Sequence, residues 1–278
     1  MKTLTGYFIK APSISVIILI CLTIIEIQLN LVRWSNKNVI TWDVIGYYSY
    51  LPATFIDKDL KLSFINDANY KKYEGTRYVS LRNKNGNRVM KFPMGMAVLY
   101  APFFAAAHIL AIPLGYADDG FSQIYQCFIA FSGLFYLLFG LLFLRKTLLL
   151  FYSEKIAALS LLFIFFGTNL LCYSSVESAM SHAYTFSLFS VFIYYCIQFL
   201  KSPTIKFTIY LGILFGLIVL IRPINVLFIL TIILIGILSF EDFKNRLKLL
   251  IQQYKLVLLF SLVSLLVILP QLLYWLYM

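Results

Sequence analysis

The sequence predicts an all-α fold, a polytopic transmembrane helical bundle. Hydrophobic residues make up 61% of the chain and charged residues 13%, and the mean hydropathy of +0.86 lies far above that of soluble proteins. The apolar segments are long, rich in Leu, Ile and Phe, and lack the alternation typical of barrel strands. We therefore predict a single transmembrane domain over residues 1–278.

The first span is predicted at residues 13–32, and a long polar loop follows at residues 33–92. The first span has membrane length and lacks a small-residue cleavage site, which indicates an anchor rather than a cleaved signal. In the loop we expect one or two interfacial helices, and a turn at the Asn- and Gly-rich residues 83–87. The loop is predicted to lie outside the membrane, on the outer face.

Residues 93–115 are apolar enough to cross a membrane, but Pro93, Pro102 and Pro113 interrupt them. We interpret this segment as a surface or re-entrant segment. A helical bundle is predicted for residues 121–278. Its expected spans cover residues 121–144, 156–172, 179–200, 207–221, 224–240 and 254–278.

Basic residues gather in three short connections between these spans, and the positive-inside rule assigns all three to the cytoplasm. The topology then has about seven crossings, provided that residues 93–115 do not cross. The net charge of the chain is +11, and the basic residues that produce it lie between the spans. This position favours membrane lipids over nucleic acid as partners. The three connections contain Arg145, Lys146 and Lys155; Lys201 and Lys206; and Lys244, Arg246 and Lys248.

This topology places five ionisable residues on the same outer face, each at or near the end of a span. Charged groups at such positions indicate a functional site by default, because a charge in or beside hydrocarbon is costly. We expect one outward-facing cavity that holds Asp43, Lys91, Glu177 and Arg222, continuous with a groove that faces lipid. The five residues are Asp43, Lys91, Glu177, His182 and Arg222.

Each residue also has a structural interpretation. Asp43, with Tyr47 and Tyr48, is either the carboxylate of a site or part of a polar turn whose tyrosines anchor an interfacial helix. Lys91 precedes Pro93 and can extend its ammonium toward a phosphate, or it can snorkel to the interface.

Glu177, His182 and Arg222 also have both a functional and a structural interpretation. Glu177 and His182 are close enough in the sequence to share a cavity, whereas a histidine alone is more often a hydrogen-bonded packing residue. Arg222 follows Gly212 and Gly216, whose spacing permits close helix approach. Its guanidinium can bind a phosphate through two hydrogen bonds, or it can face lipid head groups from a turn.

Several chemistries are excluded by the absence of their motifs. The sequence has no phosphate-binding glycine loop, no zinc-protease motif and no serine nucleophile elbow. Two histidines and scattered cysteines do not form a zinc set, so no metal site is predicted. The cysteines lie inside hydrophobic segments without CxxC spacing, which is typical of core residues: Cys21, Cys127, Cys172 and Cys196.

Taken together, these residues resemble the GT-C superfamily of glycosyltransferases, most closely bacterial family 39-like membrane proteins related to protein O-mannosyltransferases. The resemblance covers nearly the whole chain in four places: an acidic residue early in the first outer loop, a basic-Pro element closing it, a Gly-Thr element followed by an acidic residue, and a Gly-rich span ending in a basic residue. The matching residues are Asp43, Tyr47 and Tyr48; Lys91 and Pro93; Gly167, Thr168 and Glu177; and Gly212, Gly216 and Arg222.

The resemblance implies transfer of a sugar from a polyprenyl-phosphate-linked donor to a hydroxyl of an acceptor lipid, glycan or protein. The site would lie at the outer, periplasmic face of a bacterial inner membrane, and the reaction would be inverting. Asp43 would be the general base and Glu177 a second catalytic residue, which orients Lys91 or the acceptor. Lys91 and Arg222 would stabilise charge on the leaving phosphate. Tyr47, Tyr48 and His182 would complete the substrate-binding set.

Relatives differ in metal use, so the resemblance implies no certain cofactor and is compatible with a divalent cation. Family members continue beyond the point where this sequence ends, so the chain looks shortened at its carboxy terminus, and a second chain could supply the remainder. Two alternatives are a multi-pass transporter, in which the same charged residues line a pathway, and a non-catalytic membrane subunit. A transporter predicts paired broken helices in two repeats, and only the 93–115 segment is broken in this way.

Overall fold

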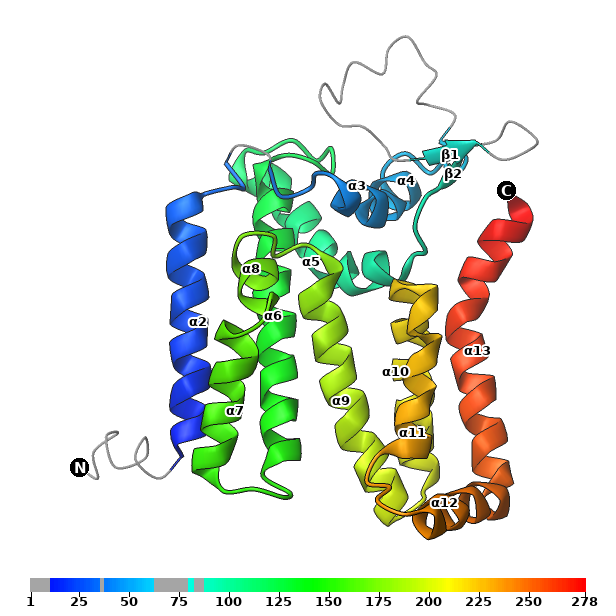
Figure 1. Ribbon diagram of the computed structural model, residues 1–278. Coiled ribbons are helices and arrows are strands. Elements are labelled where there is room, and N and C mark those ends of the chain that lie inside the picture. The colour runs from blue at the N-terminus through cyan, green and yellow to red at the C-terminus, as the bar shows by residue number, and fades with distance from the viewer. Residues whose placement is uncertain (1–10, 36–37, 63–79, 83–87) are drawn as a thin grey trace.

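The computed structural model describes residues 11–35, 38–62, 80–82 and 88–278. The described chain is a bundle of helices with one two-stranded hairpin (Figure 1). Its elements in chain order are α2 (Pro12–Leu31), α3 (Asp43–Tyr48), α4 (Tyr50–Phe55), β1 (Ser80–Arg82), β2 (Arg88–Met90), α5 (Gly95–Ala111), η3 (Ile112–Leu114), α6 (Gln123–Leu148), α7 (Glu154–Phe166), α8 (Leu170–Ser175), α9 (Ser181–Lys201), α10 (Ile205–Ile221), η4 (Pro223–Ile229), α11 (Leu230–Leu234), α12 (Phe240–Gln252) and α13 (Tyr254–Tyr277).

Five of the described helices are long and apolar enough to cross a membrane: α2, α5 with η3, α6, α9 and α13. Their outer faces remain apolar and uncovered, since only 11% of the apolar window of α13 and 22% of that of α2 is buried inside the protein. Uncovered apolar faces of this length fit hydrocarbon and not water. The protein is therefore an integral membrane protein with a polytopic helical bundle.

The two ends of the bundle carry different elements (Figure 1). One end, the loop end, has α3, α4 and the β1–β2 hairpin. The opposite end, the basic end, has α12 and the connections that join α6 to α7 and α9 to α10. The described cations that belong to the basic end are Arg145, Lys146, Lys155, Lys201, Lys206, Lys244, Arg246, Lys248 and Lys255.

Helix α5 begins and ends at the loop end (Figure 1). Its first residue, Gly95, packs so closely on the last turn of α10 that a Cβ there would overlap the backbone of Leu220. Near its other end, His108 Nδ1 lies 2.5 Å from the Tyr125 hydroxyl on the first turn of α6. The chain therefore enters and leaves α5 from the same end of the bundle. The non-crossing role of residues 93–115 stays a prediction, because by length and composition α5 with η3 also qualifies as a span.

Two predicted spans are not continuous helices. The span expected at residues 156–172 is α7 followed by α8, because the Thr168 hydroxyl donates to the Ile164 carbonyl and accepts from the Leu170 N–H, which ends one helix and starts the next. The span expected at residues 224–240 is a 3-10 helix, η4, followed by the short α11. Pro223 starts η4, and positive φ at Gly236 ends the helical run.

The long loop contains more than helices. α2 ends at Val32, whose φ of 44° is left-handed, and α3 and α4 follow as two short helices separated by Ser49. β1 and β2 pair antiparallel with Ser80 opposite Met90, and the sequence did not predict these strands. The predicted turn at residues 83–87 falls between them and lies outside the described residues.

A tyrosine-rich core lies beneath α3 and α4, between α5, α6 and α9. Tyr48 packs its ring within 6.3 Å of Tyr100 and within 5.6 Å of Phe121, and Tyr100 packs at 5.4 Å against Tyr184. Tyr184 is in turn hydrogen-bonded to Ser132 at 2.5 Å. These fully buried rings fix α3 over the ends of the spans, and α3 begins with Asp43.

Candidate functional site

Asp43 begins α3 and lies half exposed at the edge of this helix. The rest of α3, from Val44 to Tyr48, is buried, so only the Asp43 end of the helix reaches the surface. Trp42 before it has a positive φ of 50° and is 82% exposed. A positive φ is unusual for a tryptophan, and at this position it turns the backbone so that the buried helix starts directly after the exposed ring.

Lys91 meets Asp43 across the loop. Lys91 Nζ lies 3.8 Å from Asp43 Oδ1, and both side chains are close to half exposed, at 44% and 46%. Lys91 follows β2, and its ammonium also lies 4.7 Å from the centroid of the neighbouring Phe92 ring. Phe92 packs at 4.5 Å against Tyr47, on the same helix as Asp43. The structure thus brings two of the predicted site residues into contact through a ring pair beneath them.

The tyrosines of α3 are structural in this arrangement. The Tyr48 hydroxyl donates to the Gly120 carbonyl, and its side chain is fully buried. Burial raises the pKa of Tyr48 well above its ordinary value, so the hydroxyl stays protonated as a donor. Tyr47 is also buried, against Phe92. The predicted substrate contact of these two residues has no support in their geometry, since neither ring is accessible.

Glu177 binds an arginine that the sequence did not single out. Arg33, just past the end of α2, lies 2.5 Å from the Glu177 carboxylate and donates to the Val176 carbonyl at 2.5 Å and to the Asn38 carbonyl at 2.9 Å. Glu177 therefore faces Arg33, and the expected pairing with Lys91 is not present. A lone arginine at the end of a span usually reads as an interface residue, so only the packing of α2 beside α8 could reveal this partner.

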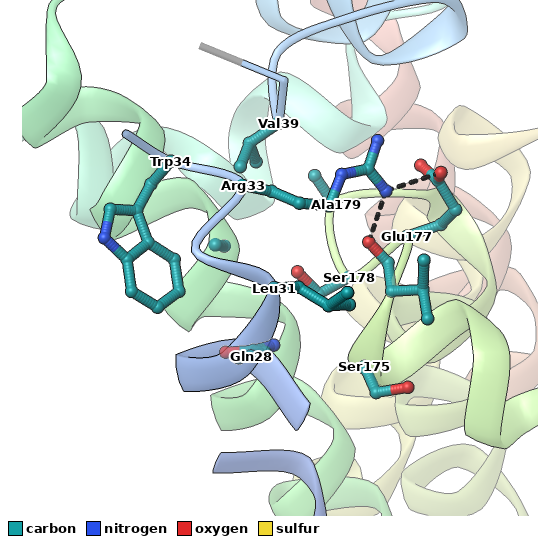
Figure 2. Close-up of a pocket in the computed structure, with 11 residues that line it drawn as sticks. Gln28, Leu31, Arg33, Trp34, Val39, Ser175, Glu177, Ser178 and Ala179 are labelled. Carbon is teal, nitrogen blue, oxygen red and sulfur yellow. Dashed lines mark hydrogen bonds and ion pairs between the residues drawn. The ribbon is translucent and has the colours of Figure 1, made fainter. Parts of the chain in front are cut away.

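A small pocket surrounds this pair at the loop end (Figure 2). The guanidinium of Arg33 points across the pocket to Glu177, while the indole of Trp34 points the other way (Figure 2). The interior measures about 10 Å³, which is room for roughly one water. The pocket does not include Asp43, Lys91 or Arg222, so it is not the common cavity expected from the sequence. It is lined by Gln28, Leu31, Arg33, Trp34, Val39, Ala130, Ser175, Val176, Glu177, Ser178 and Ala179.

His182 and Arg222 form a third group at this end. His182 lies in the first turn of α9 and stacks on Tyr173 of α8 with ring centroids 3.8 Å apart and planes 16° from parallel. Arg222 ends α10 and is close enough to His182 for their charges to interact. Within the described residues, no carboxylate lies within ion-pair distance of Arg222, so its guanidinium is available to an anion.

Tyr100 links the turn that carries Glu177 to the helix that carries Asp43, and nothing in its sequence position singled it out. Its hydroxyl donates to the Ala179 carbonyl, two residues beyond Glu177, and its ring lies in the core under α3. Gly133 of α6 packs closely against the same turn, since a Cβ there would overlap the Ser178 carbonyl. The turn that carries Glu177 is thus held against both α5 and α6, and the Asp43 helix rests on the same core.

The arrangement can support chemistry on a phosphorylated substrate at the surface of the bundle. A half-exposed carboxylate stands beside an ammonium, and a second unpaired cation lies at the same end. Among the residues with a described placement, no three His, Cys, Asp or Glu side chains gather where they could hold a metal ion.

Comparison of the chain with models of known protein families, with curated proteins and with solved structures finds no match.

Proposed function

We propose that the chain is a membrane glycosyltransferase of GT-C type that moves a sugar from a polyprenyl-phosphate-linked donor to an acceptor hydroxyl. The proposal rests on the resemblance of the sequence and on one structural observation: the Asp43 carboxylate and the Lys91 ammonium lie 3.8 Å apart on the accessible rim of a membrane bundle. A base and a phosphate-binding cation within one contact are what transfer from a lipid phosphate requires.

The reaction follows from these groups. Asp43 accepts the proton of the acceptor hydroxyl, and the oxygen attacks the anomeric carbon of the donor. The bond between that carbon and the phosphate oxygen breaks, and the lipid phosphate leaves with the bonding electron pair. Lys91 and Arg222 stabilise its charge, and this electrostatic contribution is usually the largest in such reactions. Attack opposite the leaving group inverts the anomeric centre.

Glu177 and His182 have supporting roles in this mechanism. Because Glu177 is bound to Arg33, it holds the turn before α9 and does not itself face the Asp43–Lys91 contact. His182 is fixed by its stack on Tyr173 and faces the charge of Arg222. Both residues would then orient the cationic side of the site.

The proposed orientation uses the charge difference between the two ends. The basic end carries clustered lysines and arginines, which the positive-inside rule places in the cytoplasm. The loop end would then face the periplasm of a bacterial inner membrane, where the lipid-linked donor presents its phosphate at head-group depth. The apolar uncovered faces of α2 and α13 would contact lipid.

The test measures donor consumption by the full chain in phospholipid vesicles, with radiolabelled polyprenyl-phosphate glucose, mannose and galactose as donors and a membrane extract as acceptor. Asp43→Asn should lower transfer by about 10²- to 10⁴-fold, because it removes the base but keeps its shape. Donor binding should be retained.

The matched control is Glu241→Gln. Glu241 forms a Lys244 contact of the same 3.8 Å length at the basic end, so transfer should be unchanged. Equal transfer by Asp43→Asn would contradict the role of Asp43 as the base. Passage of labelled sugar across the vesicle without donor consumption would contradict the enzyme and favour the transporter.

A further inference from the structure

The segment that carries Lys91 is held by the far end of α13. The Met90 N–H donates to the Tyr274 hydroxyl at 2.9 Å, and the Met94 N–H donates to Gln271 Oε1 at 2.7 Å. Lys91 lies between these two attachment points. Met90 is the last residue of β2 and Met94 directly precedes α5, so the two N–H groups lie at element ends, where regular secondary structure leaves donors unpaired. α13 thus supplies the acceptors that the local backbone lacks.

Two other elements complete this support. The Tyr50 hydroxyl donates to the Phe92 carbonyl at 2.7 Å, and its ring packs at 5.4 Å against Tyr274. Burial raises the pKa of Tyr50, so the hydroxyl stays protonated and keeps donating. Gly95 lies against the backbone of α10. The backbone on both sides of Lys91 is therefore fixed, while its ammonium remains half exposed.

Gln271 and Tyr274 are unusual residues for their helix. They are three positions apart and so share one face of α13, where they are 0% and 5% exposed. The rest of α13 is largely apolar and uncovered. Burying polar atoms on such a helix is costly unless they form hydrogen bonds, and the Gln271 carbonyl oxygen and the Tyr274 hydroxyl both accept from the backbone that flanks Lys91.

We propose that Gln271 and Tyr274 are positioning residues, which hold the backbone around Lys91 so that its ammonium stays opposite Asp43. Neither touches the reacting groups, and both act through the 90–94 segment. The catalytic consequence rests on the proposed transfer function, whereas the geometric consequence does not. α13 is then part of the site, although no residue of the predicted site belongs to it.

A zero-length carbodiimide measures this geometry without any substrate. The reagent activates a carboxylate, and a neighbouring amine displaces it to form an amide, so that Asp43 and Lys91 become linked with net loss of one water. Both side chains are accessible enough to react. The linked peptides are quantified by mass spectrometry in the detergent-solubilised full chain. The Glu241–Lys244 contact, also 3.8 Å and exposed, is the internal standard for reagent efficiency.

Three variants of α13 test the hydrogen bonds. Tyr274→Phe removes one acceptor and keeps the ring, and Gln271→Met removes the other and keeps the volume, so both should lower the Asp43–Lys91 link several-fold relative to Glu241–Lys244. Gln271→Glu keeps an accepting oxygen at the same position and should restore the link. Tyr277→Phe is the matched control, because Tyr277 is exposed on the same helix and its hydroxyl has no described hydrogen bond.

The same variants are assayed for transfer. Tyr274→Phe and Gln271→Met should lower kcat about 10-fold or more with little change in KM, since a misplaced cation weakens transition-state stabilisation. An unchanged link in both variants would overturn the positioning role, whatever the wild type catalyses. A reduced link, restored in Gln271→Glu, supports it even if the wild type transfers none of the offered sugars, a result that would count against the proposed function alone.

Discussion

The two ends of the bundle contain the same kinds of charged side chain but engage them differently. At the basic end, Arg145 donates to the Ser13 hydroxyl at 2.6 Å and forms an ion pair with Glu154, which also accepts from Ser13. This network ties the start of α2 to the end of α6 and the start of α7. Arg246 donates to carbonyls at the end of α11, at 2.6 Å for Ile232. These cations have protein partners and hold helices together.

At the loop end Arg33 is bound to Glu177 in the same way, but two other cations keep unused capacity. Lys91 reaches Asp43 only at 3.8 Å with both groups half exposed, and Arg222 faces no carboxylate within the described residues. Such contacts contribute little to stability, since exposed pairs at this separation are typically worth about 0–1 kcal/mol. The difference teaches that the charges with complete hydrogen bonding serve the fold, and those without it are available to a ligand.

The sharpest way to break this comparison is to neutralise one arginine at each end. Arg222→Gln should lower transfer about 10²- to 10³-fold, as loss of one electrostatic stabiliser usually does, with no change in thermal stability. Arg246→Gln should leave transfer by the folded protein unchanged. The substitution should lower the free energy of unfolding by about 1–3 kcal/mol, because the partly buried carbonyls of Ile232 and Ile235 lose their donor. Initial rates in vesicles and unfolding in detergent followed by circular dichroism measure the two effects.

Arg222→Lys refines this test. Lysine keeps the charge but loses the paired donors of the guanidinium, so partial recovery of the rate would indicate a phosphate bound through two hydrogen bonds. Equal loss of stability in Arg222→Gln and Arg246→Gln would show that both arginines are structural, and the distinction between the ends would be wrong.

A smaller effect is expected from carboxylates. Glu154→Ala should destabilise the protein by about 1–3 kcal/mol, because it removes the acceptor shared by Ser13 and Arg145. Glu241→Ala, which breaks an exposed pair on α12, should cost less than about 0.5 kcal/mol. Thermal unfolding of both variants in the same detergent is the measurement, and similar shifts in Tm would mean that the Glu154 network is no stronger than a surface contact.

Part of this picture could be predicted from the sequence. Hydropathy located the first span closely, since the prediction at 13–32 matches α2 (Pro12–Leu31), because apolar length is set by the membrane. The helix predicted at 207–221 is α10, which is shorter than the five membrane-length helices. Asp43 lies near the start of the long loop and Lys91 near its end. The structure brings them together because α3, which begins with Asp43, packs on α5, which starts shortly after Lys91.

The rest depended on packing between distant segments. The Arg33–Glu177 pair and the Gln271–Met94 bond join residues far apart in the chain, and single-sequence periodicity carries no information on such pairings. The break at Thr168 was visible as polarity, but whether it ended a span or divided one depended on a side-chain cap. The interpretation of Tyr48 as a substrate contact missed its burial because an interfacial tyrosine and a core tyrosine read alike in sequence.

The smallest expected effect concerns the start of α12, where Asp242 accepts from the Ser239 hydroxyl at 2.8 Å and completes a capping box. The hydrogen bond from Ser239 holds the pKa of Asp242 below its ordinary value of 3.8. A carboxyl whose pKa is lowered by folding stabilises the folded form when the pH is above its ordinary pKa. This contribution is lost as the pH falls through the pKa of the folded form. Protection of the Ser239 and Asp242 amides, measured relative to the intrinsic exchange rate at each pH, should therefore fall only below the ordinary value of 3.8. Asp242→Asn should show the fast exchange already at neutral pH, while exchange around Lys91 stays unchanged. Acceleration at both ends in this variant would show that α12 is coupled to the site, and the two ends would then no longer act independently.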